Sequence, residues 1–291
     1  MSREKAASKL EGLMREVSWS EQLVKRRAKI QLGRKSDLAQ TLPDIREFPL
    51  TVNPDRAANT VVVEIFVTTV RAWSPLVPGR TRTADGRMVE VARDFNAKNF
   101  RLKSGKIAKV QVRYIASGTA YQFIASKKYL PDAYSPVHSL WIRMATASGI
   151  KMTRIRDKMV SAVGGVVMKT PVAEKIKATY GNLDVKSIIN EVVQGNLAMG
   201  YTDPFHSSTG LNFLQTILST FADGKEQDML SPSVISTFEK FQNGVPFVAQ
   251  TTIQRRDAVM KSGSLEAFVM GYQTFLGADV LQSGFEFIPF G

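Results

Sequence analysis

The chain has 291 residues, 44% of them hydrophobic and 22% charged, so it can bury one large core or two moderate ones. It contains no cysteine and two histidines, His138 and His206, which excludes disulfides, thiolate metal sites, cysteine nucleophiles and a multi-histidine metal centre. The net charge of +13 suggests a polyanionic partner, but the basic residues are spread along the chain. The densest basic run, Lys25–Lys29, has no interleaved aromatic residues, so nucleic acid is not an expected partner.

The first 47 residues are predicted to form a basic helical arm or linker. Leu10, Leu13, Met14 and Val17 recur at helical spacing within a charge-rich segment that stops before Pro43. The arm is either a solvated helix face or a contact surface for a partner protein or polyanion. It lacks the apolar core of a secretory signal, and no run reaches the roughly eighteen apolar residues of a membrane span. As written, the sequence indicates a cytoplasmic protein, or a fragment of a secreted one that ends abruptly at Gly291.

Strand and helix patterns alternate between residues 50 and 147. Short β-branched or apolar runs predict strands, and longer periodic runs predict helices. The predicted strands are 50–54, 61–67 and 110–115, and the predicted helices are 89–95, 121–128 and 137–147. This order predicts an α/β layer built on a mostly parallel sheet.

A second α/β block begins near residue 159. Its predicted helices are 170–180, 185–193 and 232–241, and its predicted strands are 197–201 and 245–250. The strand at 245–250 is expected to return towards the first block. We therefore expect a first lobe of residues 48–155 plus 255–291 and a second lobe of residues 156–254. The chain is expected to cross between them near Met152–Val160 and Val248–Ile253.

Two hydroxyl-rich segments follow predicted strands and open predicted helices. Ser207, Ser208 and Thr209 precede one apolar helix, and Ser117 and Thr119 precede another. Such residues are favoured N-caps, and the free N–H groups and dipole of a helix N-terminus attract anions. The two segments either cap their helices and nothing more, or face each other across a cleft and share one small ligand.

Other polar and aromatic residues lie beside these segments. Thr68 and Thr69 end a buried strand, where α/β sheets bind ligands. Tyr201, with Phe205, forms either an aromatic wall or part of the core, and Asp203 either caps its turn or binds a ligand donor. Of the two histidines, His206 is the candidate for function because it adjoins a hydroxyl segment, whereas His138 is expected to be structural.

No catalytic pattern is present in the sequence. The Ser segments lack the Gly-x-Ser-x-Gly elbow, and neither phosphate-loop nor dinucleotide glycine motifs occur. We therefore expect a protein that is not an enzyme and needs no cofactor or metal.

Several segments together resemble the bacterial extracellular solute-binding proteins of the type II periplasmic-binding fold, in particular their anion- and molybdate-like branches. The segments that carry this resemblance are Phe95-Asn96-Ala97, Ser117-Gly118-Thr119, Pro131 to Pro136, Ser139 to Ile142, Gly200 to Pro204 and Ser207 to Leu211. The resemblance covers residues 48–291. Some relatives carry a von Willebrand-type domain after the binding module, which suits a chain cut at Gly291.

The resemblance implies two α/β lobes that close on a ligand by hinge motion. The implied ligand-binding residues are Thr68, Thr69, Ser117, Gly118, Thr119, Ser135, Tyr201, Asp203, Ser207, Ser208 and Thr209. The expected function is non-enzymatic binding of a small anionic solute, as a transport receptor or sensor, with a membrane transporter as partner. The alternatives are a cytoplasmic sensor or interaction module that uses its basic arm, and an enzyme using His206 or Asp203 as base.

Overall fold

The computed structural model describes residues 42–72, 86–156, 159, 162–249, 265–278, 281 and 283–290. Of the predicted basic arm, residues 1–41 lie outside the described part, as do residues 250–253 of the second predicted crossing. Residues from Pro43 onwards form one structural unit. Within the described residues, the longest apolar helices are too short to cross a membrane.

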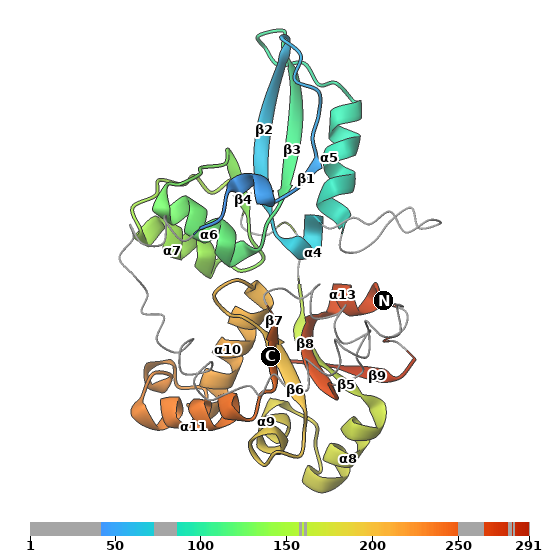
Figure 1. The fold of residues 1–291 in the computed structure, drawn as a ribbon, viewed down its shortest axis with the longest axis vertical. Helices are drawn as coiled ribbons and strands as arrows, with labels where there is room; N and C mark the ends of the chain where they lie inside the picture. Colours follow the sequence, from blue (N-terminus) through green and yellow to red (C-terminus); the bar gives the residue numbers. More distant parts are fainter. Residues whose placement is uncertain are drawn as a thin grey trace, which may run out of the picture. The chain divides into compact units, whose positions relative to one another are not determined.

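The first sheet has the strand order β1-β3-β2-β4 (Figure 1). Its strands are β1 (Leu50–Val52), β2 (Thr60–Val67), β3 (Ile107–Tyr114) and β4 (Ala133–Ser135). Strand β2 runs parallel to both β3 and β4, whereas the short edge strand β1 is antiparallel to β3. Its helices are η1 (Ile45–Glu47), α4 (Thr69–Ala72), α5 (Arg87–Ala97), α6 (Ser117–Ser126) and α7 (Leu140–Ala147).

The first sheet buries its apolar side chains against helices. Val67 of β2 and Val112 of β3 pack against Val89 and Ala92 of α5, which lies alongside β3 (Figure 1). On the other face of β2, Phe66 is fully buried and stacks on Tyr129 at 5.7 Å. Side chains alternate between the faces of a strand, so the β-branched run of β2 serves both layers.

The second sheet has the strand order β7-β6-β8-β5-β9 (Figure 1). Its strands are β5 (Gly164–Lys169), β6 (Met199–Thr202), β7 (Phe247–Ala249), β8 (Ala267–Gly271) and β9 (Phe285–Pro289). Its helices are α8 (Thr170–Tyr180), α9 (Val185–Val193), α10 (Ser208–Phe221), η3 (Glu226–Asp228), α11 (Pro232–Asn243) and α13 (Tyr272–Leu276). Strands β6, β7 and β8 are parallel, and β5 is antiparallel to β8 and β9.

Both faces of the second sheet are covered. Val166 and Met168 of β5 belong to one buried cluster with residues of α8, α9, α10 and α11, and Val167 belongs to another with Phe275 of α13. All five residues of β8 are buried, which is typical of a central strand with helices on both faces.

The predicted α/β class and the two sheets are confirmed, but the lobe membership of the last segment differs from the prediction. Residues 255–291 were expected in the first lobe, whereas β8 and β9 pair with β5 in the second sheet. The predicted strand at 245–250 is β7 and pairs with β6 instead of returning to the first sheet. The physical reason is that β5, an apolar strand, is hydrogen-bonded on both edges, so it needs two neighbours that the sequence supplies only after residue 264.

Candidate functional site

Two neighbouring strands of the first sheet end beside each other and lead into hydroxyl residues. Strand β2 is followed by Thr68 and Thr69, and β3 is followed within three residues by Ser117, the first residue of α6. Because β2 and β3 are parallel with Val67 opposite Tyr114, these hydroxyls lie at one edge of the sheet. We call residues 115–119 the Ser117 turn.

The corresponding feature of the second sheet is a turn between β6 and α10, residues 203–209, which we call the Ser207 turn. Ser207 is the N-cap of α10, and its Oγ accepts a hydrogen bond from the backbone N–H of Gly210 at 3.5 Å. The carboxylate of Asp203 accepts from the backbone N–H of Phe205 through Oδ1 at 2.8 Å. Its Oδ2 lies 2.7 Å from Nδ1 of His206. Asp203 therefore organises the turn that presents the hydroxyl residues.

The Ser117 turn and the Ser207 turn are in direct contact. The backbone N–H of Gly118 donates to the carbonyl oxygen of His206 at 2.9 Å. A Cβ atom on Gly118 would lie 1.9 Å from the carbonyl oxygen of Phe205, so this approach requires a glycine. A second link joins α7 to α10, where Nε1 of Trp141 donates to Oγ of Ser208 at 2.9 Å.

A small cavity lies between the two turns. Its volume is about 10 Å³, and ten residues line it: Thr68, Thr69, Val70, Ala116, Ser117, Val137, His206, Ser207, Ser208 and Thr209. A space of this size holds about one water molecule. A solute of several heavy atoms can therefore enter only when the two turns move apart.

The cavity is rich in hydroxyl groups and lies between two helix N-termini, those of α6 and α10. None of its lining residues, all within the described part of the chain, is Lys, Arg, Asp or Glu. Ser117 is 1% exposed, and its Oγ has no hydrogen-bond partner among the described residues. The same structural region contains no cluster of three metal-ligating side chains.

Tyr134 supports the Ser117 turn. Its hydroxyl donates to the backbone carbonyl oxygen of Ser117 at 2.6 Å. Burial, with a smaller contribution from Tyr121, raises the pKa of Tyr134 well above its ordinary value, so this hydroxyl keeps its proton and remains a donor.

The structure brings six of the eleven predicted site residues to the cavity, namely Thr68, Thr69, Ser117, Ser207, Ser208 and Thr209. Gly118 uses its N–H in the contact between the turns. Thr119 is buried in the first turn of α6, and Oγ of Ser135 accepts from Nη1 of Arg71 at 3.4 Å.

Two predicted residues have structural roles in this arrangement. Tyr201 does not line the cavity, because it packs in the second core between the rings of Phe213 and Phe241. Asp203 also lies outside the lining and holds the Ser207 turn instead. Trp141 was not among the candidates, since no sequence pattern shows that an indole in an apolar helix reaches a hydroxyl of another lobe.

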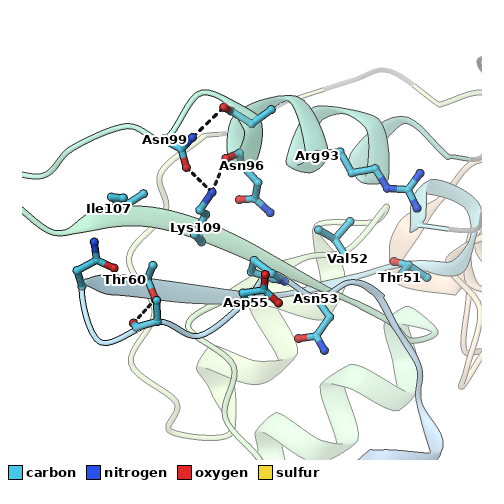
Figure 2. A pocket seen from close by; sticks show the side chains of 14 residues that line it. Thr51, Val52, Asn53, Asp55, Thr60, Arg93, Asn96, Asn99, Ile107 and Lys109 are labelled. Atoms are coloured by element: carbon cyan, nitrogen blue, oxygen red, sulfur yellow. Dashed lines mark hydrogen bonds between the residues drawn. The ribbon is translucent and has the colours of Figure 1, made fainter.

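A larger cavity of about 690 Å³ lies beside β1, α5 and the start of β3, at the other end of the first sheet (Figure 2). Nζ of Lys109 donates there to the carbonyl oxygen of Asn96 at 2.5 Å and to Oδ1 of Asn99 at 2.7 Å. The side chain of Asn96 pairs with the backbone of Val110 at the edge of β3. These polar groups satisfy one another, and no helix begins at this cavity, so we take the smaller one as the candidate site.

No family model and no curated protein matches the sequence. Solved structures with a similar fold include the sulfate-binding protein SubI from Mycobacterium tuberculosis H37Rv, with 14% sequence identity and a TM-score of 0.51. That alignment covers 78% of this chain and 70% of SubI. A periplasmic thiamin binding protein matches with 12% identity and a TM-score of 0.51, over 81% of this chain and 70% of its own. The chain therefore has the two-lobed α/β architecture of the type II periplasmic-binding fold.

Proposed function

We propose that the protein binds a small anionic solute between the Ser117 turn and the Ser207 turn and releases it chemically unchanged, as a transport receptor or sensor. The observation that carries this proposal is the hydroxyl of Ser117, which is buried beside the N-terminus of α6 without a partner. Leaving a buried polar group unpaired costs about 1–3 kcal/mol. A ligand atom that pairs with this hydroxyl would recover that cost on binding.

The charge of the solute is argued from the groups that surround the cavity. The N-termini of α6 and α10 bring the positive ends of two helix dipoles to it, and no carboxylate lines it within the described residues. Hydroxyl and backbone N–H donors suit oxygen atoms that carry negative charge. A cation would meet no compensating charge at this site.

Binding without chemical change is favoured by the absence of a nucleophile and base pair among the described lining residues. The ring nitrogen Nδ1 of His206 is engaged by Asp203, and Oγ of Ser207 accepts from the N-cap contact with Gly210. The proteins of similar fold are named for the binding of sulfate and of thiamin, which supports solute binding as the function.

The experiment is a calorimetric titration of small inorganic and carboxylate anions into the wild-type protein and Ser117→Ala. We expect Ser117→Ala to lower the affinity of the bound anion by roughly ten- to a hundredfold, the value of a hydrogen bond to a charged group. Its unfolding free energy should stay level or rise, because the substitution removes an unpaired buried group.

The matched control is Ser126→Ala, at the other end of α6, where the hydroxyl donates to the carbonyl oxygen of Phe123 at 3.2 Å. This variant should bind the anion as the wild type does. If no anion binds, or if Ser117→Ala binds as tightly as Ser126→Ala, the solute does not bind between these turns.

A further inference from the structure

The contact between Asp203 and His206 fixes which nitrogen of the imidazole carries a proton. Oδ2 of Asp203 lies 2.7 Å from Nδ1 of His206, and an ionised carboxylate only accepts hydrogen bonds. In a neutral imidazole one nitrogen is a donor and the other an acceptor, and the partner of one nitrogen selects the tautomer. Nδ1 therefore carries the proton. His206 lines the cavity, and the nitrogen left for a ligand is Nε2 with its lone pair.

The serine hydroxyls at the site have the opposite polarity. The indole N–H of Trp141 can only donate, so Oγ of Ser208 accepts from it and keeps its own proton for another partner. Oγ of Ser207 likewise accepts, from the N–H of Gly210. The cavity thus offers hydroxyl donors from Ser207 and Ser208 and one acceptor from His206.

We infer that the solute is a tetrahedral oxoanion that carries a proton, of the class of monoprotonated phosphate or arsenate. This inference rests on the proposed anion site. The unprotonated oxygens of such an anion accept from the serine hydroxyls, and its O–H group donates to Nε2 of His206. Sulfate carries no proton near neutral pH, so an oxygen lone pair would face the lone pair of Nε2. Sites built to pair with a ligand proton reject analogues that lack it.

The first test compares inorganic phosphate with sulfate by calorimetry at mildly alkaline pH, where phosphate is mainly the monoprotonated dianion. We expect phosphate to bind at least about tenfold more tightly than sulfate, because sulfate leaves a charged group facing an unmatched acceptor. A phosphate monoester in its fully deprotonated form has the same shape and charge without the proton. It should behave like sulfate.

The second test is Asp203→Asn, which reverses the tautomer. Oδ1 at this position accepts from the backbone N–H of Phe205, so the amide oxygen takes that place and the NH₂ group faces Nδ1 of His206. An NH₂ group only donates, so Nδ1 becomes the acceptor and Nε2 carries the proton. We expect this variant to prefer sulfate over phosphate. A merely structural role of Asp203 would weaken both anions alike.

His206→Phe is the companion variant, since it removes both nitrogens and keeps a planar ring. The backbone carbonyl of His206, which accepts from Gly118, is retained. We expect its phosphate affinity to fall to the level of its sulfate affinity, which also decides the matter if Asp203→Asn does not fold.

The outcomes separate this inference from the proposed function. If neither anion binds the wild type, both fail. If phosphate and sulfate bind equally well, and neither His206→Phe nor Asp203→Asn changes their ratio, the anion site stands and the role of His206 is refuted.

Discussion

The indole N–H of Trp141 donates to the hydroxyl of Ser208 at 2.9 Å, which links helix α7 beside the first sheet to the first residue of α10 on the second. The two residues are 2% and 5% exposed, so water competes little for either group. The ring of Trp141 also packs against Tyr121 of α6 at 5.8 Å. This hydrogen bond therefore stabilises the arrangement in which the Ser117 turn and the Ser207 turn touch.

Trp141→Phe should weaken that arrangement without unfolding the protein. The substitution keeps an aromatic ring against Tyr121 and removes one hydrogen bond, which contributes about 0.5–1.5 kcal/mol. We expect a larger radius of gyration by solution scattering in the absence of ligand and recovery of the compact value at saturating anion. Ser208→Ala should act in the same way, and the double variant should add nothing to it. Additive effects of the two substitutions would mean that the bond does not hold the turns together.

Gly118 and Gly210 separate the effects of closure from those of folding. A Cβ on Gly118 meets the carbonyl of Phe205 in the opposite turn, whereas a Cβ on Gly210 would lie 1.9 Å from the carbonyl of Thr202 in its own lobe. Gly118→Ala should therefore lower anion affinity at least about tenfold with a small change in melting temperature. Gly210→Ala should cost about 1–3 kcal/mol of unfolding free energy, as overpacking does. Equal melting temperatures of the two variants would contradict this division.

The sequence predicts the strands and the hydroxyl segments well because both are local. The β-branched run of β2 and the serines that open α6 and α10 follow from neighbouring residues alone. The placement of β8 and β9 depends on strand pairing across about a hundred residues, with Gly164 opposite Gly271, and local patterns do not encode such partners.

The candidate site is predicted in part for the same reason. Ser117 and Ser207 are marked by their position after a strand, whereas the role of Tyr201 depends on which side of β6 faces the core. Its ring packs against Phe213 and Phe241, far along the chain from β6, so its neighbours in sequence gave no indication. Trp141 reaches Ser208 only because two lobes meet.

The buried pair of Glu64 and Arg113 should dominate the stability of the first lobe. Nε of Arg113 donates to Oε1 of Glu64 at 2.6 Å, and both side chains are 9% exposed. Nη1 of Arg113 also donates to the carbonyl oxygens of Ile45 and Phe48, which ties the segment before β1 to the sheet. Removing one partner of a buried ion pair costs about 3–5 kcal/mol, so we expect Arg113→Met to lose that much in denaturant unfolding. The double variant Glu64→Gln with Arg113→Met should recover part of the loss, and a loss below about 1 kcal/mol in the single variant would show that the pair is dispensable.

His138 should make stability depend on pH below neutrality. Its Nδ1 accepts from the backbone N–H of Leu140 at the start of α7, at 3.1 Å, and burial lowers its pKa from the ordinary value of 6.5. As pH falls below about 6.5, the unfolded chain takes up a proton at this histidine while the folded protein resists it. The unfolding free energy should therefore fall as the medium is acidified, until the folded histidine is also protonated, and should be independent of this group at higher pH. His138→Asn retains an acceptor for Leu140 and cannot be protonated, so its stability should change less with pH in this window. The His206→Phe variant serves as control and should keep the slope of the wild type, and an unchanged slope in His138→Asn would exclude His138 as its source.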